Sequence, residues 1–306
     1  MTDQATTLRN MATAPSYNPN SFLGNSRAAN LKGASTTRLA RAIAVTSGKG
    51  GVGKSNFAVN VSLELASRGR QVSLLDADLA LANADVLFGL NPQYHLGHVL
   101  SGQRTLDEVV IEVEKNVRLI PGGSGVEELA NLSLEQHKRL VAELRAMEEG
   151  ADYMIIDTAA GIAGNVTGVL RAASEAVIVT TPDPTAVVDA YATIKVIHQH
   201  SPQKPIWIVV NDVVGVGDAE QIFVQLSAAA KRFLNHEIAH LGTIPRDAQL
   251  AEAVREQTPV VHYAPETPAS RALRLIAKQL DQTAIAEPIA GERAESFWCA
   301  YTETEV

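Results

Sequence analysis

The chain has very little cysteine, few aromatic residues and no long apolar run. Its 306 residues include a single cysteine, Cys299, so one chain cannot assemble a disulfide framework, a cysteine zinc site or an iron–sulfur cluster. No run of about 18 apolar residues occurs, and residues 1–32 contain no apolar segment like that of a signal peptide. We therefore expect a cytoplasmic protein that neither spans a membrane nor is exported through a signal peptide.

The chain also lacks an excess of positive charge. Its formal net charge is -8, which gives no overall attraction to nucleic acid or to an anionic membrane. We therefore expect no specific nucleic-acid partner. Apolar residues make up 46% of the sequence, which is enough for one large core flanked by tails.

Short apolar segments alternate with helix-length segments from Arg41 onward. The predicted strands are AIAVTS, QVSLLDAD, NVRLIPGG, YMIIDTAAG, EAVIVTTPDP, PIWIVVND and IAHLGTIP. This alternation predicts an α/β fold, with a mostly parallel twisted sheet and helices on both faces in three layers, α/β/α. We expect a flexible tail over residues 1–38, one folded domain over residues 39–282 and an acidic tail over residues 283–306.

A glycine-rich segment follows the first predicted strand and precedes a predicted helix. It reads Gly48, Lys49, Gly50, Gly51, Val52, Gly53, Lys54 and Ser55, which satisfies the eight-position P-loop pattern. The glycines let backbone N–H groups point at phosphates, and the helix adds its partial positive charge. We predict that Lys54 reaches the β- and γ-phosphates of ATP and that Ser55 ligates Mg²⁺. The alternative is a turn that only joins strand to helix.

Polar side chains stand where predicted strands end. Asp157 ends an apolar strand, as the acidic residue of a Walker B strand does, and it is a candidate to hold the Mg²⁺ shell. Asp76 and Asp78 lie at the end of an earlier predicted strand, and residues two apart share a direction in an extended chain. Both carboxylates can therefore face the γ-phosphate. Helix caps are the structural alternative for them.

The segment KGGVGKS resembles the deviant Walker A signature of the MinD, ParA and FlhG group. That resemblance implies an ATPase that forms a homodimer with ATP, in which Lys49 reaches the nucleotide of the other subunit. It also implies that Asp78 orients the attacking water, that Asp76 belongs to the magnesium environment and that Asn211 contacts adenine. Residues 157–161 correspond to switch II. A solvated lysine and an ordinary turn asparagine are the alternatives for Lys49 and Asn211.

Several stretches are more similar to FlhG, also called FleN or YlxH, than to its relatives. They are DADLALANADVLFGL, NVRLIPGGSGVEELANLS, IIDTAAGI and DAYATIKVI. The N-terminal peptide also resembles the DQAxxLR motif with which FlhG stimulates the GTPase FlhF. Its matching residues are Asp3, Gln4, Ala5, Leu8 and Arg9. The alternative is an ordinary start to a disordered tail.

The resemblance to FlhG implies a regulator of flagellar number or placement that releases its partners after ATP hydrolysis. The implied partners are FlhF, flagellar C-ring proteins and a flagellar transcription activator, and the implied location is the cytoplasm, with transient residence at the inner face of the membrane or at a cell pole.

MinD and many FlhG proteins end in a membrane-binding amphipathic helix. Here the end carries Glu292, Glu295, Glu303 and Glu305 against Arg293 alone, which puts membrane attachment in doubt. The segment SRALRLIAKQL is amphipathic too, and we expect it to pack on the sheet as the final helix.

Other interpretations of the sequence stay open at this point. A MinD-type division-site ATPase and a ParA-type segregation ATPase are the nearest alternatives, and a nucleotide-gated adaptor that does not hydrolyse ATP is an alternative of another class. The segment from His236 to His240 matches the zinc pattern HExxH. We expect it to be a strand, in which residues four apart are separated by about 13 Å, and so not a zinc site.

Overall fold

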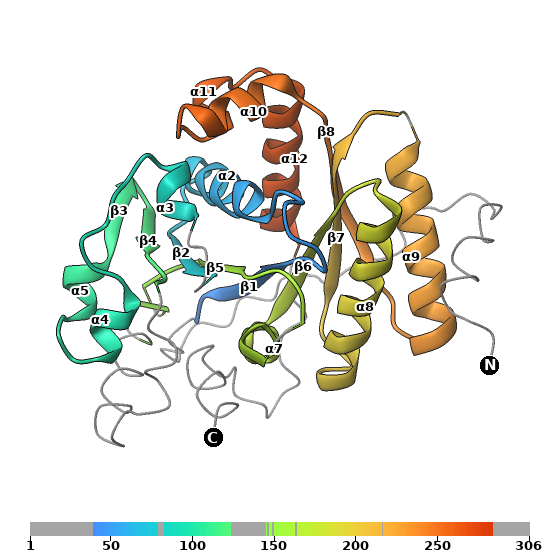
Figure 1. Cartoon of the computed structure of the whole chain (residues 1–306), viewed down its shortest axis with the longest axis horizontal. Helices are drawn as coiled ribbons and strands as arrows, with labels where there is room; N and C mark the ends of the chain where they lie inside the picture. The colour runs from blue at the N-terminus through green and yellow to red at the C-terminus, as the bar shows by residue number, and fades with distance from the viewer. Residues whose placement is uncertain are drawn as a thin grey trace, which may run out of the picture.

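An eight-stranded sheet forms the centre of the molecule (Figure 1). The computed structural model describes residues 39–78, 83–123, 145, 147–148, 150–162, 164–215 and 217–283. The strand order is β3-β4-β2-β5-β1-β6-β7-β8. The strands are β1 (Arg41–Thr46), β2 (Val72–Ala77), β3 (Ile111–Glu114), β4 (Val117–Ile120), β5 (Tyr153–Thr158), β6 (Glu175–Thr180), β7 (Ile206–Val213) and β8 (Ala239–Pro245).

Every neighbouring pair of strands is parallel except β3 with β4. The mostly parallel sheet is therefore confirmed, and each of the seven predicted strands is present. The antiparallel edge strand β3 was not predicted. Its sequence, IEVE, alternates between half-buried and exposed side chains, so it lacks the continuous apolar run of the central strands.

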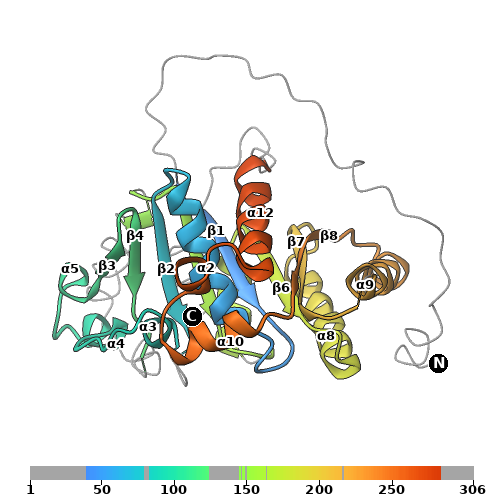
Figure 2. The same ribbon diagram turned by 90° about the horizontal axis from the view of Figure 1, so that it is seen from above.

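Helices cover both faces of the sheet, as predicted (Figures 1 and 2). One face carries α2 (Lys54–Ser67), α10 (Ala248–Arg255), α11 (Val260–Tyr263) and α12 (Pro268–Gln282). The other carries α7 (Gly164–Ala172), α8 (Pro184–His200) and α9 (Asp218–Leu234). Short helices α3 (Ala84–Leu87), α4 (Leu96–Leu100) and α5 (Leu106–Val109) lie between β2 and β3 in the chain.

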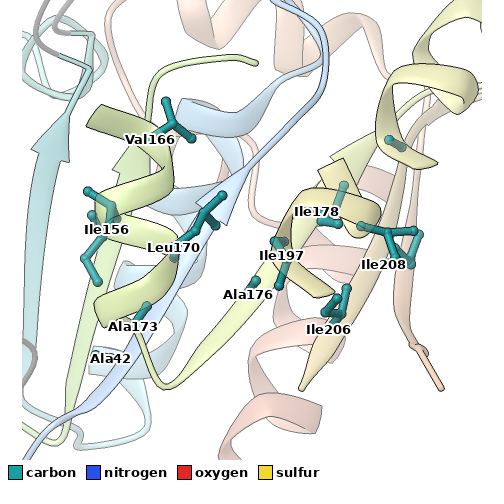
Figure 3. Close-up of a cluster of buried hydrophobic side chains, with 14 of the residues drawn as sticks. Ala42, Ile156, Val166, Leu170, Ala173, Ala176, Ile178, Ile197, Ile206 and Ile208 are labelled. Atoms are coloured by element: carbon teal, nitrogen blue, oxygen red, sulfur yellow. The ribbon is translucent and has the colours of Figure 1, made fainter. Parts of the chain in front are cut away.

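The apolar core is divided by the sheet into two clusters. Strand side chains pointing to the α7–α9 face meet those helices, as Figure 3 shows for Ile156, Leu170, Ile178 and Ile197. Each of the strands β1, β5 and β6 has six residues, and all of them are buried, so these central strands have apolar contacts on both faces. Burial on both faces is why their sequences are continuous apolar runs without alternation.

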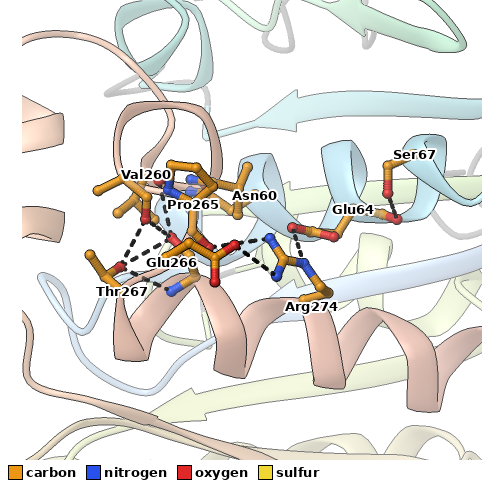
Figure 4. Close-up of polar contacts among 11 residues, drawn as sticks. Asn60, Glu64, Ser67, Val260, Pro265, Glu266, Thr267 and Arg274 are labelled. Carbon is orange, nitrogen blue, oxygen red and sulfur yellow. Dashed lines mark hydrogen bonds and ion pairs between the residues drawn. The ribbon is translucent and has the colours of Figure 1, made fainter.

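The segment SRALRLIAKQL is part of α12 and packs on the sheet, as predicted. Leu273, Ile276 and Leu280 are buried, whereas Leu275 is 66% exposed. Polar contacts join α12 and α11 to α2, the helix that contains the end of the P-loop (Figure 4). Glu64 of α2 is 3.4 Å from Arg274 of α12, and the Asn60 side chain accepts a hydrogen bond from the Val261 N–H at 3.1 Å.

The HExxH segment is not helical. His236 and Glu237 precede β8, which begins at Ala239, so the strand prediction holds only for the second part of the segment. Nδ1 of His236 lies 3.2 Å from Nδ1 of His198 on α8, and the His240 ring stacks on Phe223 of α9. The two histidines of the pattern therefore have different neighbours. Among the described residues, we find no group of three or more potential metal ligands.

Candidate functional site

The P-loop follows the end of β1 at Thr46, and its last two residues, Lys54 and Ser55, begin α2, as predicted. Two of its glycines are required, Gly48 by a close backbone neighbour and Gly53 by its positive φ. A Cβ on Gly48 would lie 2.3 Å from the Asp189 carbonyl on α8. Gly53 has φ +94°, and a Cβ there would lie 2.4 Å from the Asn211 side-chain nitrogen. The loop is thus held between α8 on one side and β7 on the other.

Asp157 lies in the central strand β5, at the carboxyl edge of the sheet. It is fully buried, and within the part of the chain that the structure describes neither carboxylate oxygen accepts a well-formed hydrogen bond. Burial raises the pKa of Asp157 to about 7, and the nearby Lys54 ammonium and Ser55 hydroxyl oppose that shift. Lys54 is itself only 8% exposed. Unpaired buried carboxylate oxygens beside a P-loop fit a hard divalent cation such as Mg²⁺.

Asp76 lies directly opposite Asp157 on the neighbouring strand, since the two residues are Cα partners in the β2–β5 register. The Asp76 carboxylate accepts hydrogen bonds from the backbone N–H groups of Asp78 (3.1 Å), Asn83 (2.9 Å) and Ala84 (3.0 Å). Burial raises the pKa of Asp76 to about 6, although these hydrogen bonds act to lower it. Asp76 therefore organises the start of α3, which is the structural alternative foreseen for these carboxylates. Asp78 follows β2 and is half-buried.

Lys49 is bound within its own chain. Its Nζ donates to Oδ2 of Asp183 at 3.0 Å and to Oγ1 of Thr185 at 2.8 Å. Asp183 is the N-cap of α8 and also accepts a hydrogen bond from the Thr185 N–H at 2.8 Å. The Thr185 and Lys49 side chains hold the pKa of Asp183 well below its usual range. The Lys49 side chain is still 42% exposed, so this ion pair lies at the surface.

A cavity of about 550 Å³ adjoins the loop at Lys49, and its size falls within the usual range of small-molecule sites. Asp212 and Arg246 stand on its wall and form a two-point ion pair, with both N–O distances 2.7 Å. Asn211 precedes Asp212, and its side-chain nitrogen donates to the Val52 carbonyl at 2.8 Å. The strand β7 runs two residues beyond Asn211, to Val213, so Asn211 lies within the strand.

The structure thus brings together the P-loop, Asp76, Asp78, Asp157 and Asn211 at the carboxyl edge of the sheet. The peptide Asp3 to Arg9 lies outside the described residues. Sequence reasoning missed Asp183 and Thr185, although an Asp directly before a Pro at a helix start is a recognisable N-cap signal. It also missed the pair Asp212 and Arg246, which carries no local signal.

The ParA family model, described as NUBPL iron-transfer P-loop NTPase, matches residues 38–281. The chain belongs to this family. A metal-cluster carrier needs pairs of cysteines, and this chain has Cys299 alone, so the match indicates the P-loop NTPase family without indicating iron transfer.

Two curated relatives are an antiactivator and a flagellum site-determining protein. The chain is 38% identical to the antiactivator FleN of Pseudomonas aeruginosa over 239 residues, 78% of this chain and 85% of FleN. It is 35% identical to the flagellum site-determining protein YlxH of Helicobacter pylori over 278 residues, 90% of each chain. The similarity to the FlhG, FleN and YlxH group is therefore confirmed.

Solved MinD structures share the fold. The cell-division ATPase MinD of Pyrococcus furiosus has a TM-score of 0.67 and 25% identity, covering 80% of this chain and all of that one. The septum site-determining protein MinD of Pyrococcus horikoshii, complexed with Mg-ADP, has a TM-score of 0.65 and covers 80% and 97% of the two chains. This ParA-family member is therefore a P-loop ATPase. None of its described helices meets the length and apolarity needed to traverse a bilayer.

The buried Asp157 makes a testable prediction about stability. Its raised pKa means that, between about pH 4 and pH 7, the folded protein keeps a proton that the unfolded chain has released. The free energy of unfolding without nucleotide should therefore fall as pH rises through this window, with a contribution from Asp157 of roughly 4 kcal/mol at most. Asp157→Asn should match the wild type near pH 4 and be more stable at pH 8.

Urea unfolding at a series of pH values measures this difference. Carboxylates whose pKa is lowered, such as Asp212 and Asp281, give the opposite slope, and Asp76, whose pKa is also raised, gives the same slope. All three are present in both proteins, so the difference between the two profiles reports Asp157 together with its coupling to Asp76. Asp107→Asn, on an exposed residue of α5, is the matched control and should keep the wild-type profile. Identical profiles for Asp157→Asn and the wild type would contradict the burial argument.

Proposed function

We propose that this chain is an ATP-hydrolysing molecular switch that dimerises with ATP and regulates flagellar number or placement. The observation that carries the proposal is the similarity to FleN and YlxH over 78% and 90% of the chain, combined with a P-loop that contains Lys49. In the same proposal residues 1–38 are a tail with an activation peptide, residues 39–282 are the ATPase domain and residues 283–306 are an acidic tail.

In the proposed nucleotide site, the P-loop backbone and Lys54 bind the phosphates of ATP and Asn211 contacts adenine. Ser55 and Asp157 would hold Mg²⁺, with Asp76 in its immediate environment, and the ion would neutralise phosphate charge when bound. The unpaired oxygens of buried Asp157 support this assignment. Asp76 already accepts three backbone hydrogen bonds, so its part is mainly to keep negative charge beside Asp157 and to fix the chain that leads to Asp78.

Two observations support dimerisation through the carboxyl edge of the sheet. Lys49 is half-exposed there, and its partners among the described residues are one surface carboxylate and one hydroxyl. Apolar side chains near it are exposed: Val214, at 71%, lines the same cavity as Lys49, Val188 on α8 is 39% exposed, and Ile162, which follows Gly161, is 50% exposed. An exposed group of apolar residues at the rim of a polar site is typical of a protein interface. A second copy of this chain is the partner that the deviant P-loop requires.

The N-terminal peptide is proposed to stimulate the GTPase FlhF. Leu8 supplies an apolar anchor, and Gln4 and Arg9 supply polar contacts, so a short segment can order on its partner. Flagellar C-ring proteins or a flagellar transcription activator are further proposed partners. The proposed location is the cytoplasm, with transient residence at the inner face of the membrane or at a cell pole.

GTP hydrolysis by FlhF tests the flagellar part of the proposal. A peptide covering residues 1–10 should stimulate that hydrolysis, and the same peptide with Arg9→Ala should lose the stimulation. Deleting residues 1–10 from the whole chain should remove stimulation of FlhF and leave basal ATP hydrolysis unchanged. Absence of stimulation by both the peptide and the whole chain would contradict the FlhF assignment. The MinD-type function, which the fold similarity to MinD favours, would then be the leading candidate.

A further inference from the structure

Ser47, the residue before the P-loop, makes two hydrogen bonds that connect different parts of the site. It is fully buried. Its hydroxyl donates to the Lys49 carbonyl at 2.8 Å. Its own carbonyl accepts from the Gly161 N–H, also at 2.8 Å. Gly161 closes the switch II segment, so one residue contacts both that segment and Lys49.

We propose that Ser47 is a positioning residue that couples the switch II segment, residues 157–161, to Lys49. The inference rests on the proposed function of Lys49 in the ATP-bound dimer. A serine hydroxyl bonded to the carbonyl two residues further on closes a tight turn and fixes the direction of that carbonyl. The direction of the Lys49 main chain sets where its side chain leaves the loop. The ammonium at the far end is held separately by Asp183 and Thr185.

The switch II segment is bound to the end of β1 at two points. The Thr158 hydroxyl donates to the Val45 carbonyl at 3.1 Å, and the Gly161 N–H donates to the Ser47 carbonyl. Asp157 lies directly opposite Val45 in the β1–β5 register, so the two bonds follow the buried carboxylate. A shift of residues 158–161 changes the bond at Ser47, and with it the turn that fixes Lys49. Ser47 thereby links the position of the switch II segment to the position from which Lys49 reaches the other subunit of the dimer.

Ser47→Ala removes the hydroxyl and keeps the Ser47 carbonyl. We expect ATP binding by the monomer to stay within about twofold, because Lys54 and Ser55 are untouched. The dissociation constant of the ATP dimer should rise about three- to tenfold, the change that one net hydrogen bond supports, and kcat should fall by a similar factor. Ser73→Ala is the matched control, since Ser73 in β2 is equally buried but its hydroxyl has no partner within the described residues. It should behave as wild type.

Two further variants separate positioning from a general effect on the fold. Ser47→Thr keeps the hydroxyl and should recover dimerisation. In a Lys49→Ala background, Ser47→Ala should change single-turnover hydrolysis of radiolabelled ATP by less than about twofold, because a residue that acts through Lys49 has nothing left to position. Equal losses in both backgrounds, with no recovery by threonine, would overturn the inference.

The outcome also separates this inference from the proposed function. If Lys49→Ala prevents dimerisation while Ser47→Ala dimerises and hydrolyses ATP as wild type, only the role of Ser47 is wrong. If Lys49→Ala itself dimerises normally, the proposed dimer mechanism is wrong and the coupling through Ser47 fails with it. Thermal unfolding of each variant shows whether a loss of dimer comes from a loss of fold.

Discussion

Lys49→Ala is expected to prevent ATP-dependent dimerisation and to lower ATP hydrolysis by about three orders of magnitude. A cation supplied to the phosphates by a docked partner contributes about 10³- to 10⁵-fold to hydrolysis in P-loop enzymes. The monomer should still bind ATP within about twofold of wild type, because the phosphate contacts of Lys54 and the loop backbone remain. Size-exclusion chromatography with light scattering and steady-state phosphate release measure the two effects.

The structure explains why Lys49 can change partners. Its ion pair with Asp183 joins side chains that are 42% and 46% exposed, and exposed pairs of this kind contribute little to stability. The phosphates of a nucleotide carry more negative charge than the single carboxylate of Asp183, so we expect Lys49 to bind them more strongly in the dimer. Lys195→Ala, on an exposed face of α8, removes a lysine without touching the loop and is the control. Normal dimerisation by Lys49→Ala would mean that Lys49 is an ordinary solvated lysine with no role in the dimer.

The central part of the fold could be predicted from the sequence because its strands are buried on both faces. β1, β5 and β6 are continuous apolar runs, and a parallel sheet with two helical layers is the architecture that such runs require. β3 escaped prediction because an edge strand of four residues with one face in solvent has no comparable signal. The P-loop was recognisable because its chemistry depends on residues adjacent in the chain.

The partners of the site residues were harder to foresee because they are distant in sequence. Lys49 and Asp183 are 134 residues apart, and they meet because β1 and β6 are neighbours in the sheet. That neighbour order depends on the whole topology and not on either segment. The pair Asp212 and Arg246, 34 residues apart, forms for the same reason, across β7 and β8. Asp76 was assigned to the magnesium environment. Its carboxylate also accepts hydrogen bonds from three backbone N–H groups, and the sequence did not show which of these two roles it has.

Asp78→Ala is expected to keep ATP-dependent dimerisation and to lower hydrolysis by about 10²- to 10⁴-fold, the usual contribution of a side chain that orients or deprotonates the nucleophile. Asp78 follows β2 directly, and the bond from its N–H to Asp76 fixes its backbone at the carboxyl edge of the sheet. Asp76 cannot take its place, because the Asp76 carboxylate is buried and already accepts three hydrogen bonds.

The oligomeric state distinguishes this variant from Lys49→Ala, although both should hydrolyse ATP slowly. A water-orienting residue acts after the dimer has formed, so Asp78→Ala should accumulate as a long-lived dimer with ATP, whereas Lys49→Ala should stay monomeric. Asp107→Ala, on the exposed side of α5, should behave as wild type in both measurements. A monomeric Asp78→Ala protein that binds ATP poorly would instead assign Asp78 to nucleotide binding. Fast hydrolysis by a dimeric Asp78→Ala protein would exclude it from positioning the water.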